Sequence, residues 1–281
     1  MDYNLLSKKL ENPLIKKLLT ELIPVFQELE IKFFIIGATA RDIIMELHGE
    51  LSGRRTQDID IAIAVDKWSS FDNIKKVILQ LSNFKKDPKQ EQRFFYMEEF
   101  QLDIVPYGGI ADAEHKIFWP PDQSFAMSVL GFEEVEKDLL RVKIDDSLEI
   151  EVVSLVGIFI LKLVAWKDRH FKSNKDADDM GFILLNYLHI HDERAALEYY
   201  DEVYGIEKMS ITKAGAALLG IDINKLLSDH KSSKKKLKII IENELALNEN
   251  SVLFNQIIET NYIKFNEVIE CFEIINQKLK Q

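Results

Sequence analysis

The feature that most constrains this sequence is a change of hydrophobic pattern near residue 153. Before it, short apolar runs with strand-like alternation are interspersed with helical segments, whereas after Ser154 nearly every segment has helical period. Strands confined to one part of a chain, followed by helices alone, indicate the α+β class. We therefore predict a mixed β-sheet domain flanked by helices at 1–153 and an all-helical C-terminal domain at 154–281.

Composition narrows the class of protein. The 281 residues are 47% hydrophobic and 30% charged, which is enough apolar material for two cores, and the single cysteine, Cys271, excludes a disulfide framework and Cys-rich zinc sites. A net charge of -11 opposes nucleic-acid binding over most of the surface. The most apolar stretch, 152–166, is interrupted by Lys162 and is shorter than the about 20 residues that span a bilayer. We expect a cytoplasmic protein with no membrane partner.

The expected elements of the first domain follow from turn residues and periodicity. A helix should begin after Asn12 and be kinked or ended by Pro24, and Pro106 should end a strand. The remaining expectations are a strand at 33–36, a helix at 38–48, a strand at 58–65, a helix at about 71–81, strands at 93–97 and 100–105, and two or three strand-like pieces between 127 and 153.

Three carboxylates are the candidate catalytic groups. Asp58 and Asp60 are two apart on a predicted strand, so both point to one face while Ile59 and Ile61 point to the other. Adjacent like charges repel unless a cation lies between them. Taken alone, however, this short motif is more simply explained by an exposed polar strand end. Asp103 lies inside an apolar strand, where a carboxylate is costly unless it sits at the sheet edge or meets a cation. If the two strands pair, three carboxylates converge on a site suited to Mg²⁺.

A strand-glycine-helix junction precedes these acids. Gly37 ends the strand at 33–36, and a helix start there directs free backbone N–H groups toward one point, which makes an anion site. A plain tight turn explains a single glycine equally well. Arg41, in the first turn, either reaches a phosphate or pairs with an acid to hold the fold.

A second group of charges lies past the pattern change. Lys162, Trp166 and Arg169 share one helical stripe, and Lys162 interrupts an otherwise apolar helix. It either extends to solvent or meets a phosphate. Asp176 and Asp179 share a face of the next helix, which is also ordinary helix-start chemistry.

Together these residues resemble the polymerase-β-like nucleotidyltransferase superfamily, in which a strand-glycine-helix junction is followed by Asp-x-Asp on the next strand and by a third Asp. Residues 36–42 are similar to the Gly-Gly-x-x-Arg-Asp element of CCA-adding enzymes, and the Lys162–Arg169 and Asp176–Asp179 stretches look like late motifs of AbiEii-type toxins. The resemblance covers 30–185. Ala38 departs from it, because the family has glycine or serine there.

The resemblance implies a nucleotidyltransferase-type fold and transfer of a nucleoside monophosphate from a nucleoside triphosphate. It makes Asp58, Asp60 and Asp103 both catalytic residues and ligands of Mg²⁺ or Mn²⁺, with Trp166 stacking a base. The residues implied to bind the nucleotide are Gly37, Ala38, Thr39, Arg41, Lys162, Arg169 and Asp176.

The acceptor implied is an RNA such as tRNA, or a protein, in a toxin–antitoxin or phage-defence system with an antitoxin protein as partner. Two alternatives remain open. One is a small-molecule nucleotidyltransferase of the aminoglycoside-modifying kind, and the other is a relative that binds nucleotide or a partner protein without turnover.

Overall fold

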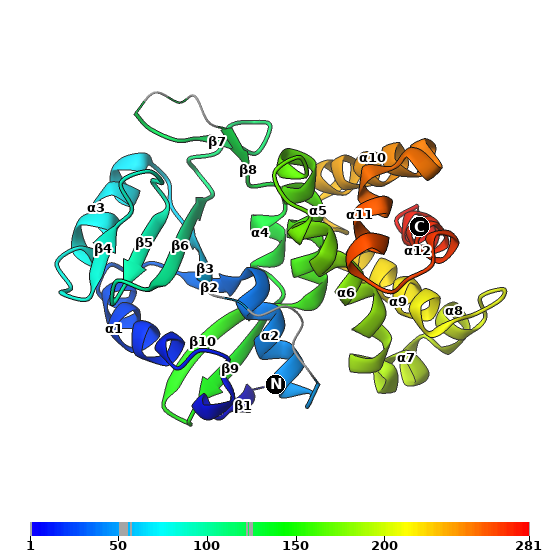
Figure 1. Cartoon of the computed structure of the whole chain (residues 1–281), viewed down its shortest axis with the longest axis horizontal. Helices are drawn as coiled ribbons and strands as arrows, with labels where there is room; N and C mark the ends of the chain where they lie inside the picture. Colours follow the sequence, from blue (N-terminus) through cyan, green and yellow to red (C-terminus); the bar gives the residue numbers. More distant parts are fainter. Residues whose placement is uncertain (1, 51–55, 57, 122, 124–125, 281) are drawn as a thin grey trace. The chain divides into compact units, whose positions relative to one another are not determined.

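The computed structural model describes residues 2–50, 56, 58–121, 123 and 126–280. They form two compact units, Met1–Ser154 and Leu155–Gln281. Strands lie in the first unit and the second is helical, which confirms the α+β class (Figure 1). No helix of the described part of the chain is both long and apolar enough to cross a membrane.

The first unit is built on a mixed sheet of eight strands in the order β1-β9-β10-β2-β3-β6-β5-β4, with β7 and β8 paired separately. The strands are β1 (Asp2–Leu5), β2 (Phe33–Ile36), β3 (Asp58–Ala64), β4 (Phe84–Lys86), β5 (Arg93–Tyr96), β6 (Phe100–Tyr107), β7 (Lys116–Phe118), β8 (Ala126–Ser128), β9 (Leu139–Ile144) and β10 (Leu148–Val153). The helices of this unit are α1 (Leu14–Glu28), α2 (Gly37–Leu47), α3 (Trp68–Ile78) and α4 (Phe132–Val135), with a 3-10 turn at Ser7–Lys9.

The centre of the sheet is formed by β2, β3 and β6 (Figure 1). β3 pairs antiparallel with β2 and parallel with β6. Ile59, Ile61 and Ile63 of β3 are fully buried, as expected from their alternation with the two aspartates. This packing fixes the register of β3, and the register in turn fixes which face the aspartates occupy.

Neither of the two prolines ends its element, so the helix end expected as one outcome at Pro24 and the strand end expected at Pro106 were wrong. Pro24 lies inside α1, which continues to Glu28, because the helix buries an apolar face on both sides of the proline. Pro106 lies inside β6, which continues to Tyr107. β5 pairs with β6 only from Phe100 to Asp103, so Pro106 falls beyond that ladder and its missing N–H breaks no hydrogen bond to β5.

The helix expected from residue 71 begins earlier, at Trp68. The Trp68 ring contacts Trp119, with ring centroids 5.3 Å apart, and Phe71 completes the aromatic group. This packing with a residue distant in sequence explains why helical periodicity alone missed the first turn.

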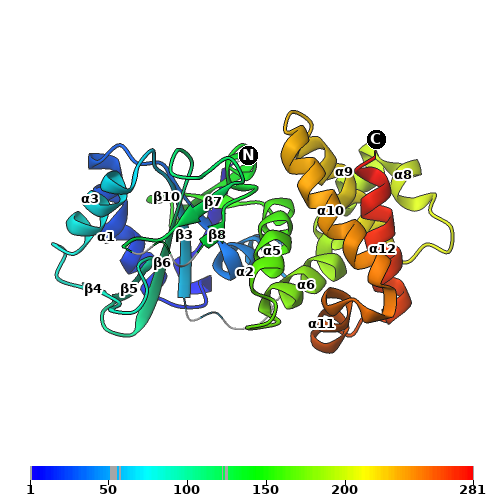
Figure 2. The ribbon, with the colours of Figure 1, turned by 90° about the horizontal axis from the view of Figure 1, so that it is seen from above.

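The second unit consists of helices that pack around α9. Its helices are α5 (Leu155–Arg169), α6 (Lys175–Ile190), α7 (Asp192–Glu198), α8 (Tyr200–Tyr204), α9 (Ile211–Leu226), α10 (Lys231–Leu247), α11 (Val252–Thr260) and α12 (Phe265–Lys278), with a 3-10 turn at Asn248–Asn250. Figure 2 shows α10 beside α12, and α12 also packs against α9 within this unit. Gly220 of α9 leaves space for α12, because a methyl group there would lie 3.1 Å from Cα of Ile275.

Candidate functional site

Three charged side chains form one row across the centre of the sheet. Asp60 of β3 is in register with Asp103 of β6, and Asp103 is in register with Arg93 of β5. Paired residues point to the same face of a sheet, and so do residues two apart on one strand, so Asp58 lies on this face as well. Asp103 is buried, whereas Asp58 and Asp60 are half-buried. The sheet therefore brings together the three carboxylates that the sequence singled out.

Arg93 occupies both oxygens of Asp103. Its Nε donates to Oδ1 and its Nη2 to Oδ2, each at 2.7 Å. The hydrogen bond to Asp103 raises the pKa of Arg93 although burial opposes it, and the charges of Asp103, Asp58 and Asp87 add to the increase. A two-point pair of this kind fixes the plane of the carboxylate.

Gly37 closes the other end of the row, where β2 passes into α2. Its φ is +70°, and a Cβ at this position would lie 2.4 Å from Oδ2 of Asp60. Glycine is therefore required by the backbone angle and by the approach of the carboxylate. The Thr39 hydroxyl donates to the Asp58 carbonyl oxygen at 2.9 Å, so the first turn of α2 is tied to the start of β3.

The other residues of this turn point into the fold. Ala38 and Thr39 are buried, and Arg41 is 1% exposed. Nε and Nη2 of Arg41 donate to Oδ1 of Asp42 at 2.9 and 2.7 Å. Of the two roles considered for Arg41, this geometry favours pairing with an acid over contact with a phosphate. Only the backbone of the turn is then left to meet an anion.

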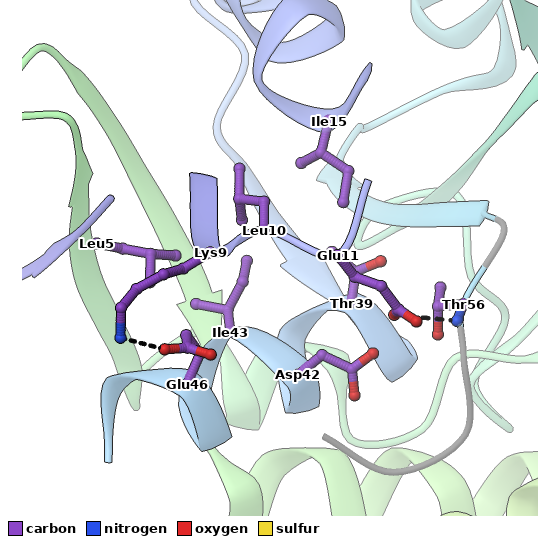
Figure 3. Close-up of a pocket in the computed structure, with 10 residues that line it drawn as sticks. All are labelled: Leu5, Lys9, Leu10, Glu11, Ile15, Thr39, Asp42, Ile43, Glu46 and Thr56. Carbon is purple, nitrogen blue, oxygen red and sulfur yellow. Dashed lines mark hydrogen bonds and ion pairs between the residues drawn. The ribbon is translucent and has the colours of Figure 1, made fainter. Parts of the chain in front are cut away.

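A small cavity of about 40 Å³ lies on the side of α2 that carries Thr39 and Asp42 (Figure 3). Glu11 lines it and accepts a hydrogen bond from the Thr56 backbone N–H at 3.1 Å, which links the N-terminal segment to the residues that precede β3. Burial raises the pKa of Asp42 to about 6; Arg41 opposes the increase and Glu11 adds to it. Asp42 is therefore a buried acid that lines the same small cavity as a second acid, Glu11.

The charged residues of the second unit form a cluster of their own. Lys162 Nζ lies 2.6 Å from Oδ2 of Asp179 and 3.3 Å from Oδ1 of Asp176. Arg169 donates to both oxygens of Asp176, at 2.7 and 2.8 Å. Burial would lower the pKa of Lys162, but the carboxylates of Asp179 and Asp176 raise it above its usual value. The Lys162 side chain is 13% exposed and that of Arg169 is 53% exposed, so Arg169 is the more accessible cation.

Trp166 does not present its ring for stacking on a base. It is 3% exposed, its Nε1 donates to Oε1 of Gln256 at 2.8 Å, and its ring stacks on His170. The expectation of a base-stacking role was wrong, because the indole N–H has a partner inside the helical unit and the ring packs there with it.

The residues of the row fit a divalent cation in part. Asp58 and Asp60 supply two carboxylates on one face, and the missing Cβ of Gly37 leaves room at Asp60. Both oxygens of Asp103 already accept from Arg93, so this carboxylate would meet a cation through its remaining lone pairs and beside the charge of Arg93. Among the residues that the structure describes, no group of three or more acidic, histidine or cysteine side chains is arranged to hold a metal.

A comparison with models of protein families finds a match to "Nucleotidyl transferase AbiEii toxin, Type IV TA system" over residues 18–249. The match covers most of the chain. This chain belongs to the AbiEii nucleotidyltransferase family. In this AbiEii-family chain the matched region contains the whole row of charges, the α2 turn and the Lys162 cluster.

Solved structures similar to this AbiEii-family chain are distant. An antigenic nucleotidyltransferase-like protein from Paracoccidioides brasiliensis is 16% identical, with a TM-score of 0.41, and the match covers 74% of this chain and 94% of that one. The cyclic dinucleotide synthase CdnE from Elizabethkingia meningoseptica is 10% identical, with a TM-score of 0.30, and covers 97% of this chain and 93% of its own. No curated protein matches the chain in sequence.

Sequence reasoning missed Arg93. It was read only as the first residue of a strand, and its partner lies ten positions away across the turn that joins β5 to β6. Their opposite charges on adjacent predicted strands were a partial signal, but a turn at 98–99 places Arg93 opposite residue 104. The observed turn leaves three residues, 97–99, between the paired strands, and this shift of one position brings Arg93 opposite Asp103.

Proposed function

We propose that this chain transfers a nucleoside monophosphate from a nucleoside triphosphate to an acceptor, with Asp58, Asp60 and Asp103 as its acidic centre. The observation that carries the proposal is the register of Asp60 with Asp103 beside a glycine-led helix start. Membership of the AbiEii family supports the reaction class.

The backbone of α2 is suited to the triphosphate. Ile36 precedes the helix and provides no side-chain cap, and the backbone N–H groups and positive dipole end at the start of α2 favour phosphate. The buried side chains of Ala38 and Thr39 support this turn from inside. Ala38 stands where the family has glycine or serine. Compared with serine, it lacks one hydroxyl donor, but the backbone N–H groups stay in place.

A divalent cation, Mg²⁺ or Mn²⁺, held by Asp58 and Asp60 would supply positive charge beside the triphosphate. Asp103 would accept the hydrogen bond of the acceptor hydroxyl or complete the cation site, and in either role it would share its oxygens with Arg93 or give up that contact. Lys162, Arg169 and Asp176 remain the proposed nucleotide-binding residues of the helical unit. Of these, Arg169 has the exposure needed to meet a phosphate.

The acceptor is proposed to be an RNA such as tRNA, or a protein. The family description, a toxin of a type IV toxin–antitoxin system, supports a role as a toxin with an antitoxin protein as partner. A chain with a net charge of -11 would have to approach an RNA acceptor through a limited surface.

The direct test uses each of the four nucleoside triphosphates labelled at the α-phosphate. The purified chain is incubated with one triphosphate, Mg²⁺ and either total RNA or a cell protein fraction. Label in macromolecules and release of pyrophosphate are then measured. Asp58→Asn and Asp60→Asn should abolish both signals, while Glu99→Gln, at an exposed carboxylate in the turn between β5 and β6, should leave them intact.

Three outcomes would overturn parts of the proposal. Unchanged labelling by Asp58→Asn and Asp60→Asn would show that the acidic centre lies elsewhere. Labelling of an added aminoglycoside but of no macromolecule would show that the acceptor is a small molecule and not an RNA or a protein. Tight nucleotide binding with no pyrophosphate under any condition would make the chain a nucleotide-binding protein without turnover.

A further inference from the structure

The side chains of Arg93 and Asp103 form a two-point ion pair in the row of charges across β3, β6 and β5. Both of their hydrogen bonds measure 2.7 Å, and the side chains are 20% and 12% exposed. A partly buried two-point pair of this kind is much stronger than a surface ion pair. Asp103 is therefore held by a cation of the chain itself.

The other neighbour of Asp103 in the row is Asp60, on the adjacent parallel strand β3. A divalent cation bound by Asp60 would draw on the same carboxylate that Arg93 holds. Arg93 would also repel that cation directly, since two positive charges would share one small, partly buried region. The row thus places two cations in competition for one acid.

We propose that Arg93 is a positioning residue that sets how readily the acidic centre takes up a divalent cation, by occupying Asp103 until that cation arrives. The inference rests on the proposed function, since it needs the row to be a cation site. It adds that the chain carries its own competing cation, Arg93, on the strand β5 next to Asp103. Removal of the positive charge of Arg93 should then strengthen binding of the divalent cation. If Arg93 had only a structural role, its removal would weaken that binding or leave it unchanged.

The test measures Mn²⁺ binding without nucleotide or acceptor, from the electron paramagnetic resonance signal of the free ion at pH 7.5. Arg93→Gln should bind Mn²⁺ about tenfold more tightly than the unmodified chain, because a competing charge has been removed. Arg93→Lys, which keeps the charge, should stay within about threefold of the unmodified chain. Arg141→Gln is the matched control, because Arg141 is an arginine of the same sheet with a 77% exposed side chain, and it should have no effect.

A double-mutant cycle separates competition for Asp103 from a general change of charge. In an Asp103→Asn background the two cations have no shared acid, so most of the gain from Arg93→Gln should disappear. Thermal unfolding of each variant shows whether it is folded, and Arg93→Met, which also removes the positive charge, replaces Arg93→Gln if that variant does not fold.

Unchanged or weaker Mn²⁺ binding by folded Arg93→Gln would overturn the inference, as would a gain of the same size in the Asp103→Asn background. Failure of all variants, including the unmodified chain, to bind Mn²⁺ at millimolar concentration would overturn it too. Because the assay contains no triphosphate, these results are independent of nucleotidyl transfer. Loss of the inference alone would leave labelling intact, and loss of the proposed function alone would leave the Mn²⁺ effect intact.

Discussion

Gly37 and Asp60 approach each other so closely that a single methyl group cannot be inserted between them. A Cβ on Gly37 would lie 2.4 Å from Oδ2 and 3.4 Å from Cβ of Asp60. The turn that begins α2 and the aspartate of β3 therefore constrain each other. Either the carboxylate or the helix start must move if the glycine is replaced.

Gly37→Ala should reduce nucleotidyl transfer strongly, because it displaces Asp60 as well as straining the backbone. The strain alone should cost about 1–2 kcal/mol of the free energy of unfolding. Gly49→Ala is the matched control, since Gly49 also has a positive φ, +73°, but a Cβ added there would meet no atom within 4 Å. Urea unfolding and the labelling assay should show similar strain in both variants and loss of activity only at Gly37. Equal loss of activity in the two would argue against the Asp60 contact.

Asp42 should make the chain less stable as the pH rises through the weakly acidic range. Its pKa is about 6 in the folded chain, raised from 3.8 by burial. The unfolded chain therefore loses this proton first, and the free energy of unfolding falls as the pH rises from about 4 to about 6. The two-unit shift corresponds to at most about 3 kcal/mol.

Asp42→Asn should remove that part of the pH dependence, as measured by urea unfolding between pH 4.5 and 7.5. Its amide oxygen can still accept from Arg41, so the arginine keeps a partner. Asp146→Asn, at an exposed carboxylate of the same unit, should leave the slope unchanged. A constant difference between the unmodified chain and Asp42→Asn across this range would show that Asp42 is already ionised at pH 4.5.

Lys162 should contribute more to stability than Arg169, although both contact Asp176. Lys162→Met removes the cation that lies 2.6 Å from the fully buried Asp179, which should cost about 3–5 kcal/mol of the free energy of unfolding. Arg169→Gln removes a half-exposed partner and should cost about 1 kcal/mol or less. Chemical denaturation measures both, and the double variant Lys162→Met with Asp179→Asn should recover much of the loss. Equal costs for the two single variants would contradict this order.

Cys271 should be inert while the chain is folded. It is fully buried in α12, and burial raises the pKa of its thiol to about 12, so the reactive thiolate is almost absent at neutral pH. The chain should not react with a thiol-specific chromogenic disulfide in native buffer and should release one equivalent in 6 M guanidinium. Rapid reaction in native buffer would show that α12 opens readily.

The sequence was sufficient to predict those parts of the fold and site that depend on local pattern. The alternation of 58–65 predicts a strand with Asp58 and Asp60 on one face, and the loss of strand signals after Ser154 predicts a helical second half. β1 escaped prediction, because it is short and its partner, β9, lies more than 130 residues away. β4 escaped as well, since three residues carry too little periodicity.

The chemical state of the site was harder to predict than its location. The pairing of Arg93 with Asp103, the burial of Arg41 and the internal hydrogen bond of Trp166 each depend on a neighbour that only the tertiary structure supplies. Arg41 and Trp166 have residue types common at phosphate and base contacts, and each is instead satisfied within its own unit. Composition and spacing identify charged groups, but they do not show which of them already have partners.

The contact between Trp68 and Trp119 also makes the molecule its own spectroscopic probe. These two of its three tryptophans lie in the first unit, and Trp166 alone lies in the second. With Trp68 and Trp119 replaced by phenylalanine, the remaining emission reports the helical unit alone, and with Trp166 replaced it reports the sheet unit alone. Denaturation followed by fluorescence can therefore show whether the two units melt together or in sequence.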